Sequence, residues 1–399
     1  MVSRNRILVI AAAAVSSALL ACSAILGLDD TNVVPGYQRD ASAASDATSD
    51  AKDASDATAF TDADADAGPA CDADLTTDTK NCGSCGHDCL GGTCVAAKCQ
   101  PIVLLDGVQY KPTGLAVDDT SVFVMEGNTE SILRVSKDGD GGVATVVANE
   151  PNLFDMVASG GYVYFSNPTS ADGGAGMVSR CATSGCTQGT RLDFTKANKH
   201  PQSLAMDSTQ LYYAYSDSNG EVWACDLPGC SNAKRQTIAL EPFSLTLSGN
   251  RVYWYSYQSP DLSYCNKGGC VGNGVYTHTG SVNLVYGMAA DATYLYIADV
   301  AGTVSRVETA LFQSEDKLAA GQASPHYLLE DGGYLFWINR GTGPNFTDGA
   351  LLRCPKAACG ANLEVLASGL KVVFALVQDA DALYYASSAD GKVWRLRKP

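Results

Sequence analysis

The stretch LAVDDTSVFVMEGNTESILRV, residues 115–135, contains three short apolar segments separated by turn residues. The first segment ends at Asp118, the second holds Val122 and Phe123, and the third ends at Val135. Valine, isoleucine and phenylalanine favour strands, whereas Asp, Asn and Gly favour the turns of antiparallel hairpins. We therefore expect three consecutive antiparallel strands in this stretch.

This pattern recurs seven times after residue 100, at intervals of 40 to 48 residues. Its most regular feature is a Val or Leu followed directly by an aromatic residue: Val122-Phe123, Val163-Tyr164, Leu211-Tyr212, Val252-Tyr253, Leu295-Tyr296, Leu335-Phe336 and Leu383-Tyr384. A fourth apolar segment, such as ATVVA at 144–148, closes most units. Four short strands repeated at this period predict an all-β fold, a seven-bladed β-propeller over residues 100–399.

The last unit is one strand short, because the chain stops after its third strand, KVWRLRKP. The segment PIVLLDG at 101–107 precedes the first unit and parallels VLASG, which belongs to the fourth strand of unit six. We expect this N-terminal strand to complete the seventh blade, because closure removes two exposed sheet edges.

The repeat resembles the YWTD and NHL types of propeller repeat, in which LAVD is followed by an aromatic strand and an I-x-R strand. Leu115 to Asp118 and Ile132 to Arg134 show the pattern best. The resemblance implies a propeller, although YWTD propellers have six blades and this chain has seven units.

Four cysteine pairs share a gap of four residues and follow the third strand of their units: Cys181 and Cys186, Cys225 and Cys230, Cys265 and Cys270, Cys354 and Cys359. A hairpin turn of this length brings the two Cα atoms within the range that a disulfide requires. We expect four disulfides that pin the outer hairpins of their blades.

The first 21 residues have the two parts of a secretory signal, Arg4 and Arg6 followed by an apolar run. The sequence Leu-Leu-Ala-Cys at 19–22 resembles the lipobox of bacterial lipoproteins. The resemblance implies acyl chains on Cys22 as the mature N-terminus. Since Ser23 replaces the usual Asp retention signal of that family, we expect a lipid-anchored protein of the bacterial outer membrane, facing the periplasm or the cell surface.

Residues 22–70 predict a disordered acidic tether, because Ala, Asp, Ser and Thr dominate them and bury little apolar surface. Ten Asp residues lie between 29 and 70 against Arg39 and Lys52, a balance of −8 out of a formal net charge of −16. No basic stripe occurs anywhere in the chain, so we expect no nucleic-acid partner.

Residues 71–99 hold six cysteines: Cys71, Cys82, Cys85, Cys89, Cys94 and Cys99. In an exported chain an even number of cysteines predicts a small disulfide-rich module, with fifteen possible pairings for six. The core NCGSCG at 81–86 resembles the stigma-specific cysteine-rich family. The alternative is zinc, because Cys82 and Cys85 form a CxxC half-site near His87.

The sequence contains no HExxH, GxSxG, Walker or dinucleotide-binding motif. We therefore assign no catalytic, cofactor-binding or metal-ligating residue, and interpret the recurring turn aspartates (Asp118, Asp207, Asp291, Asp331 and Asp379) as turn caps. Two functions stay open. The first is a non-enzymatic binding or scaffolding propeller for a protein or polysaccharide, and the second is a hydrolase or lyase with its site at the channel mouth. Carboxylates beside His200, His278 or His326 would favour the enzyme, and exposed Tyr and Trp side chains would favour binding.

Overall fold

The computed structural model describes residues 72–107, 109–169, 175–186, 190–194, 199–270, 275–278 and 282–399. All of them belong to the compact unit Ala67–Pro399. The predicted signal peptide, the tether with Cys22, and Cys71 lie outside the described residues. In the described part, no helix has the length and apolar character needed to cross a membrane.

Seven four-stranded antiparallel sheets form a propeller, and each sheet is one blade. Blade 1 contains β4 (Pro112–Val117), β5 (Ser121–Glu126), β6 (Ser131–Ser136) and β7 (Val143–Val147). Blade 2 contains β8 (Asp155–Ser159), β9 (Tyr162–Thr169), β10 (Ala175–Ala182) and β11 (Leu192–Phe194). Blade 3 contains β12 (Pro201–Met206), β13 (Gln210–Tyr215), β14 (Gly220–Asp226) and β15 (Ser231–Ala239).

The next three blades repeat this order. Blade 4 contains β16 (Pro242–Ser248), β17 (Arg251–Ser256), β18 (Asp261–Asn266) and β19 (Tyr276–His278). Blade 5 contains β20 (Val285–Ala290), β21 (Tyr294–Asp299), β22 (Thr303–Glu308) and β23 (Glu315–Ala320). Blade 6 contains β24 (Pro325–Asp331), β25 (Tyr334–Asn339), β26 (Gly349–Pro355), the 3₁₀ helix η1 (Cys359–Ala361) and β27 (Glu364–Leu370).

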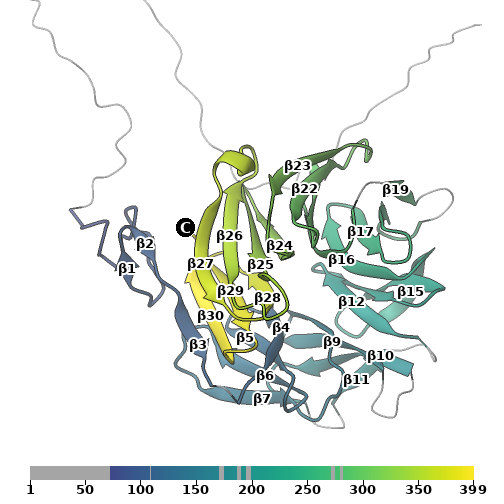
Figure 1. The fold of residues 1–399 in the computed structure, drawn as a ribbon. Helices are drawn as coiled ribbons and strands as arrows, with labels where there is room; N and C mark the ends of the chain where they lie inside the picture. Colours follow the sequence, from purple (N-terminus) through teal and green to yellow (C-terminus); the bar gives the residue numbers. More distant parts are fainter. Residues whose placement is uncertain are drawn as a thin grey trace, which may run out of the picture. The chain divides into compact units, whose positions relative to one another are not determined.

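Blade 7 combines the two ends of the propeller, as the sequence predicted. It contains β28 (Val373–Gln378), β29 (Ala382–Ser387), β30 (Lys392–Arg397) and the N-terminal strand β3 (Ile102–Leu105). In Figure 1 the yellow strand β30 lies beside the blue strand β3, and Val103 pairs with Trp394 in the register. The innermost strands contact one another in sequence, and β28 contacts β4, so the ring closes.

The repeated aromatic residue of each second strand is buried between blades. All seven of these side chains are at most 2% exposed: Phe123, Tyr164, Tyr212, Tyr253, Tyr296, Phe336 and Tyr384. Each contributes to a hydrophobic cluster, and most of these clusters span two neighbouring blades, as where Tyr296 packs with Leu335 and Trp337. The aromatic column that marks the repeat in the sequence is therefore the packing surface of the blades.

Three turn aspartates, Asp207, Asp291 and Asp379, cap their turns and also pair with a lysine of the next blade. Asp379 accepts backbone N–H bonds from Asp381 and Ala382, as the turn-cap interpretation predicts, and its other oxygen lies 2.7 Å from Lys137 Nζ of blade 1. Equivalent ion pairs join neighbouring blades elsewhere: Asp207 with Lys267, Asp291 with Lys356, and Asp331 with Lys398. Burial would raise the pKa of Asp379, but the bonds from Lys137, Tyr384 and the backbone outweigh it and lower the pKa to about 2.

The arginine of the I-x-R pattern also reaches the next blade. Its guanidinium donates to a backbone carbonyl there in five blades: Arg134 to Thr183, Arg180 to Pro228, Arg306 to Lys356, Arg353 to Pro399 and Arg395 to Lys137. Charged hydrogen bonds of this kind fix orientation as well as distance. The arginine of the I-x-R pattern thus joins neighbouring blades.

Candidate functional site: the channel mouth

The innermost strands of all seven blades surround a cavity of about 550 Å³, which we call the channel cavity. Leucine, methionine and phenylalanine dominate its lining, and the polar side chains include Thr113, Ser203 and Ser244. A second cavity of about 440 Å³, the mouth groove, opens beside it between blades 2 and 5. The two cavities share Phe154, Phe243 and Tyr286, so these rings form the boundary between channel and surface.

These three rings form a continuous arc at the end of the channel where the innermost strands begin. The rings of Phe154 and Phe243 are 5.9 Å apart edge to face, and those of Phe243 and Tyr286 are 5.5 Å apart in the same geometry. Phe154 is 43% exposed and Tyr286 is 38% exposed. We call Phe154, Phe243 and Tyr286 the mouth arc. Tyr257, which is 56% exposed, extends the aromatic surface along the mouth groove.

Register shifts in the innermost strands orient the side chains of the mouth arc. Six of the seven innermost strands shift register close to their first residues, as between Phe243 and Thr246 of β16 and between Val285 and Gly287 of β20. A bulge re-aims the side chains beside it. Gly287 allows the close approach of β24, because a Cβ there would lie 2.6 Å from the backbone nitrogen of Leu328.

Asp155 is the one charged side chain among the described residues that line the channel cavity. Its Oδ2 accepts the backbone N–H of Leu204 in blade 3 at 2.8 Å, and its Oδ1 accepts the N–H of Met156 at 2.8 Å. Burial raises the pKa of Asp155 to about 6, and these two N–H bonds only partly offset the effect. An ionised carboxylate is therefore costly here.

The three histidines of the propeller lie in different environments. His200 Nδ1 lies 2.6 Å from Asp217 Oδ1 near the strand starts of blade 3, so a histidine–carboxylate pair does exist on this side. His326 is buried, with its ring stacked 4.9 Å from Tyr286 and its Nδ1 bonded to the Ser324 carbonyl. His278 lies in the outer strand β19. Among the described lining residues of both cavities there is no histidine.

The exposed aromatic surface differs from the one considered from the sequence, because tyrosine and phenylalanine form it and tryptophan does not. Trp254 and Trp337 are at most 1% exposed and pack between blades. Trp223 donates its Nε1–H to Glu221 at 2.9 Å. Among the described residues at the channel mouth, the mouth arc and Tyr257 therefore meet the aromatic criterion for binding.

All four cysteine pairs are disulfides, with Cα separations of 5.2 Å for Cys181–Cys186, 4.7 Å for Cys225–Cys230, 5.5 Å for Cys265–Cys270 and 4.7 Å for Cys354–Cys359. They join the third strand of each blade to the turn before the fourth strand, as the sequence predicted, and they also take part in packing between blades. The first cysteine of each pair is 0% exposed and packs against the preceding blade. The Cys186 N–H donates to Val146 of blade 1, so the stapled loop also docks on its neighbour.

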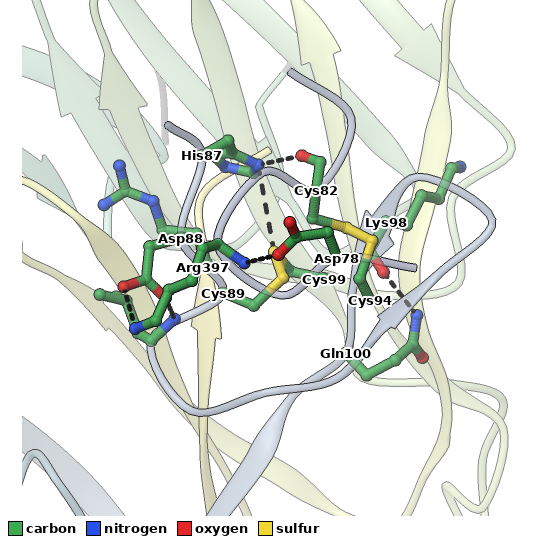
Figure 2. Close-up of a disulfide and its surroundings, with 12 residues drawn as sticks. Asp78, Cys82, His87, Asp88, Cys89, Cys94, Lys98, Cys99, Gln100 and Arg397 are labelled. Carbon is green, nitrogen blue, oxygen red and sulfur yellow. Dashed lines mark hydrogen bonds and ion pairs between the residues drawn. A yellow bond between two sulfur atoms is a disulfide. The ribbon is translucent and has the colours of Figure 1, made fainter. Parts of the chain in front are cut away.

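The cysteine module contains the short hairpin of β1 (Cys94–Val95) and β2 (Lys98–Cys99). Figure 2 shows its disulfides Cys82–Cys94 and Cys89–Cys99. Cys85 is disulfide-bonded as well. Sulfurs of Cys82, Cys89 and Cys99 lie together. Because these disulfides consume the thiolates that zinc would need, the described cysteines do not fit the zinc alternative.

The module docks on blades 6 and 7. His87 Nε2 lies 2.9 Å from the Lys398 carbonyl, and Arg395 of β30 donates to the Leu90 carbonyl. A cavity of about 310 Å³ lies along this contact, and its charged groups are already paired, Lys98 and Arg353 with Glu364. This cavity is therefore part of an internal docking surface.

The sequence interpretation missed the mouth arc and Asp155, although a signal was present. When the units are aligned at their first strands, one position holds Thr113, Phe154, Gln202, Phe243, Tyr286, His326 and Phe374. The next position holds small residues in most units and Asp155 in blade 2. Both positions come before the apolar segment that defined the repeat, so the alignment of that segment left them out.

No protein-family model matches the chain. Over 143 residues it is 27% identical to human low-density lipoprotein receptor-related protein 5, a match that covers 35% of this chain and 8% of that protein. The chain thus spans far less than two thirds of this relative. The local likeness agrees with a YWTD-like propeller.

Several solved propellers share the fold, each covering 75% of this chain. Virginiamycin B lyase from Staphylococcus aureus is 14% identical with a TM-score of 0.58 and 99% of its chain covered. U3-55K is 15% identical with a TM-score of 0.58 and 98% covered. The WD40 propeller domain of Doa1 is 12% identical with a TM-score of 0.57 and 97% covered. At such identities the likeness shows the fold alone.

Proposed function

We propose that this chain is a non-enzymatic binding protein, a propeller held at the bacterial outer membrane by a lipid on Cys22. Its ligand, a protein segment or a polysaccharide, enters the channel cavity past the mouth arc. The observation that carries this proposal is the mouth arc itself. Elsewhere in the propeller the repeated aromatic side chains are buried between blades, whereas here Phe154 and Tyr286 are each more than a third exposed around a cavity. Clustered exposed rings beside a cavity are typical of binding sites.

The composition of the lining favours binding over catalysis. General acid–base chemistry needs a titratable group within hydrogen-bond reach of the reacting atoms, and histidine is the commonest choice. The described lining of the channel cavity offers one carboxylate, Asp155, and that of the mouth groove offers one, Glu241. The site therefore offers a ligand shape and apolar surface rather than groups for acid–base chemistry.

The test uses the full-length protein in detergent, applied to a glycan array and to a peptide array. We expect the double variant Phe243→Ala/Tyr286→Leu to bind any ligand so found at least about tenfold more weakly, because it removes two of the three rings of the arc. Tyr334→Leu is the matched control, since Tyr334 is 39% exposed but lies on β25, outside both cavities. Unaltered binding by the double variant, or no ligand on either array, would contradict the proposal.

A lyase or hydrolase is the second candidate, because His200 and Asp217 form a histidine–carboxylate pair near the mouth groove and lyases occur among the structural neighbours. Incubating the wild-type protein with each ligand found, followed by mass spectrometry, separates the two functions. We expect the ligand mass to stay unchanged. A product that disappears in His200→Ala would favour the enzyme.

A further inference from the structure

Asp155 has no cationic partner within the described part of the chain. The backbone N–H groups of Met156 and Leu204 are its hydrogen-bond donors, and none of the ion pairs found there includes it. No other described residue that lines the channel cavity carries a charge at neutral pH. A negative charge in an apolar cavity without a counter-charge is a binding determinant for a cation.

Blade docking does not explain why this residue is an aspartate. At the equivalent position of blade 3, Ser203 Oγ accepts the N–H of Leu245 in blade 4 at 2.9 Å, the same bond that Asp155 makes to Leu204. A hydroxyl is therefore enough to join two blades at this point. Beyond this bond the carboxylate adds a local bond to the Met156 N–H, a charge at the cavity, and a penalty for burying that charge.

Besides the Asp155 carboxylate, the site contains the aromatic rings of the mouth arc. Aromatic faces carry negative electrostatic potential and attract organic cations, most strongly where water is excluded. Phe243 is the central ring of the arc, with Tyr286 on one side, and Phe154 on the other side is the residue next to Asp155. We propose that the channel mouth binds an organic ammonium group, with Asp155 as its counter-charge and the rings of the mouth arc around it. This inference rests on the proposed binding function and names the chemistry of its ligand.

The same surroundings argue against a metal ion at this point. Calcium takes six to eight oxygen ligands and magnesium an octahedral set. Leucine, methionine and phenylalanine dominate the lining, and the Ser203 and Ser244 hydroxyls are already used between blades. A large, weakly hydrated cation fits a lining of this kind, and a small, strongly hydrated ion does not.

The test compares choline with its neutral carbon isostere, 3,3-dimethylbutan-1-ol, on the full-length protein. Saturation transfer from the protein to the ligand methyl protons detects binding, and calorimetric titration measures affinity. We expect the wild-type protein to bind choline about tenfold more tightly than the isostere, and Asp155→Ser to remove that preference. Tyr286→Leu should weaken choline binding by roughly threefold to tenfold.

Asp316→Asn is the matched control, because it removes one negative charge from the exposed outer strand β23 and should leave choline binding unchanged. Asp155→Asn serves as a second variant if Asp155→Ser does not fold. Equal binding of choline and isostere that Tyr286→Leu weakens would overturn the ammonium inference and leave the binding function in place. No choline binding, or full binding by Asp155→Ser, would overturn it as well.

Choline binding should also weaken as the pH falls below about 6, where Asp155 takes up a proton. Choline keeps its charge, so only the protein titrates. The strands packed against β8 are β4, β9 and β12, and none of their ionisable side chains lines the cavity. Tyr286 of β20 and Tyr327 of β24 do line it. Burial lowers the pKa of His326, which disfavours its charged form, and the Arg340 guanidinium stacks on Phe374. Binding that is constant from pH 7.5 to pH 5 would contradict the role of Asp155.

Discussion

Asp155 reduces the stability of the folded propeller at neutral pH. Its pKa is about 6 in the folded state against an ordinary value of 3.8, because burial disfavours the ionised form. The folded state therefore binds this proton more tightly than the unfolded chain does. Stability falls as the pH rises from about 4 to 6, and it stays lower above that range, by at most about 3 kcal/mol for a shift of roughly two units. Buried charges with raised pKa values are typical of functional sites.

Asp155→Ser should raise the free energy of unfolding at pH 7.5 by about 1–3 kcal/mol, because it removes the buried charge and keeps an acceptor for the Leu204 N–H. Near pH 4 the gain should vanish, since the native carboxyl is then protonated. Urea unfolding of variant and wild type at the two pH values measures the difference. A variant that is less stable than the wild type at pH 7.5 would show that the carboxylate stabilises the fold.

At the scale of single elements, the short strand β3 holds the ring closed. Leu104 and Leu105 are 8% and 3% exposed and belong to the core cluster that joins blades 1 and 7. The cysteine module stabilises the same region, because Arg395 of β30 donates hydrogen bonds to the Leu90 carbonyl of the module and to the Lys137 carbonyl of blade 1. A strand of four residues thus covers the sheet edge that β30 would otherwise expose.

Replacing Leu105 by alanine should lower the free energy of unfolding by about 2–5 kcal/mol, the usual cost of truncating a buried leucine. Val103→Ala is the control within the same strand, because Val103 is 43% exposed, and it should cost well under half as much. Denaturant unfolding under oxidising conditions gives both values. Similar small losses for both variants would mean that β3 contributes little to closure.

At the scale of the whole molecule, a lipid on Cys22, as we propose, would determine the location of the propeller in the cell. A chain anchored by several acyl groups stays at the membrane, whereas a single acyl group gives only marginal binding. The acidic composition of residues 22–70 predicts a long, extended tether between the anchor and the folded part. The channel mouth would then reach ligands away from the lipid surface.

Cells grown with radiolabelled palmitate should label the wild-type protein and leave Cys22→Ser unlabelled. The wild type should sediment with the outer-membrane fraction, and the variant should not, because it lacks the acyl chains. Cys22→Ser should nevertheless retain the choline and array binding of the wild type, since residue 22 is remote in sequence from the propeller strands. Labelling of Cys22→Ser would refute the lipobox interpretation.

The sequence by itself determined the propeller, its seven blades and the completion of the last blade by β3. Each blade repeats the same local features, namely its strands, its turn residues and its buried aromatic residue. The pattern therefore occurs seven times in one chain. The features that differ from blade to blade were decided by the tertiary structure. Asp155 meets the mouth arc only because residues of blades 2, 4 and 5 converge on one channel, and the first cysteine of each stapled pair is buried only because the preceding blade covers it. Distances between blades are set by ring closure, a property of all seven units together that no single repeat encodes.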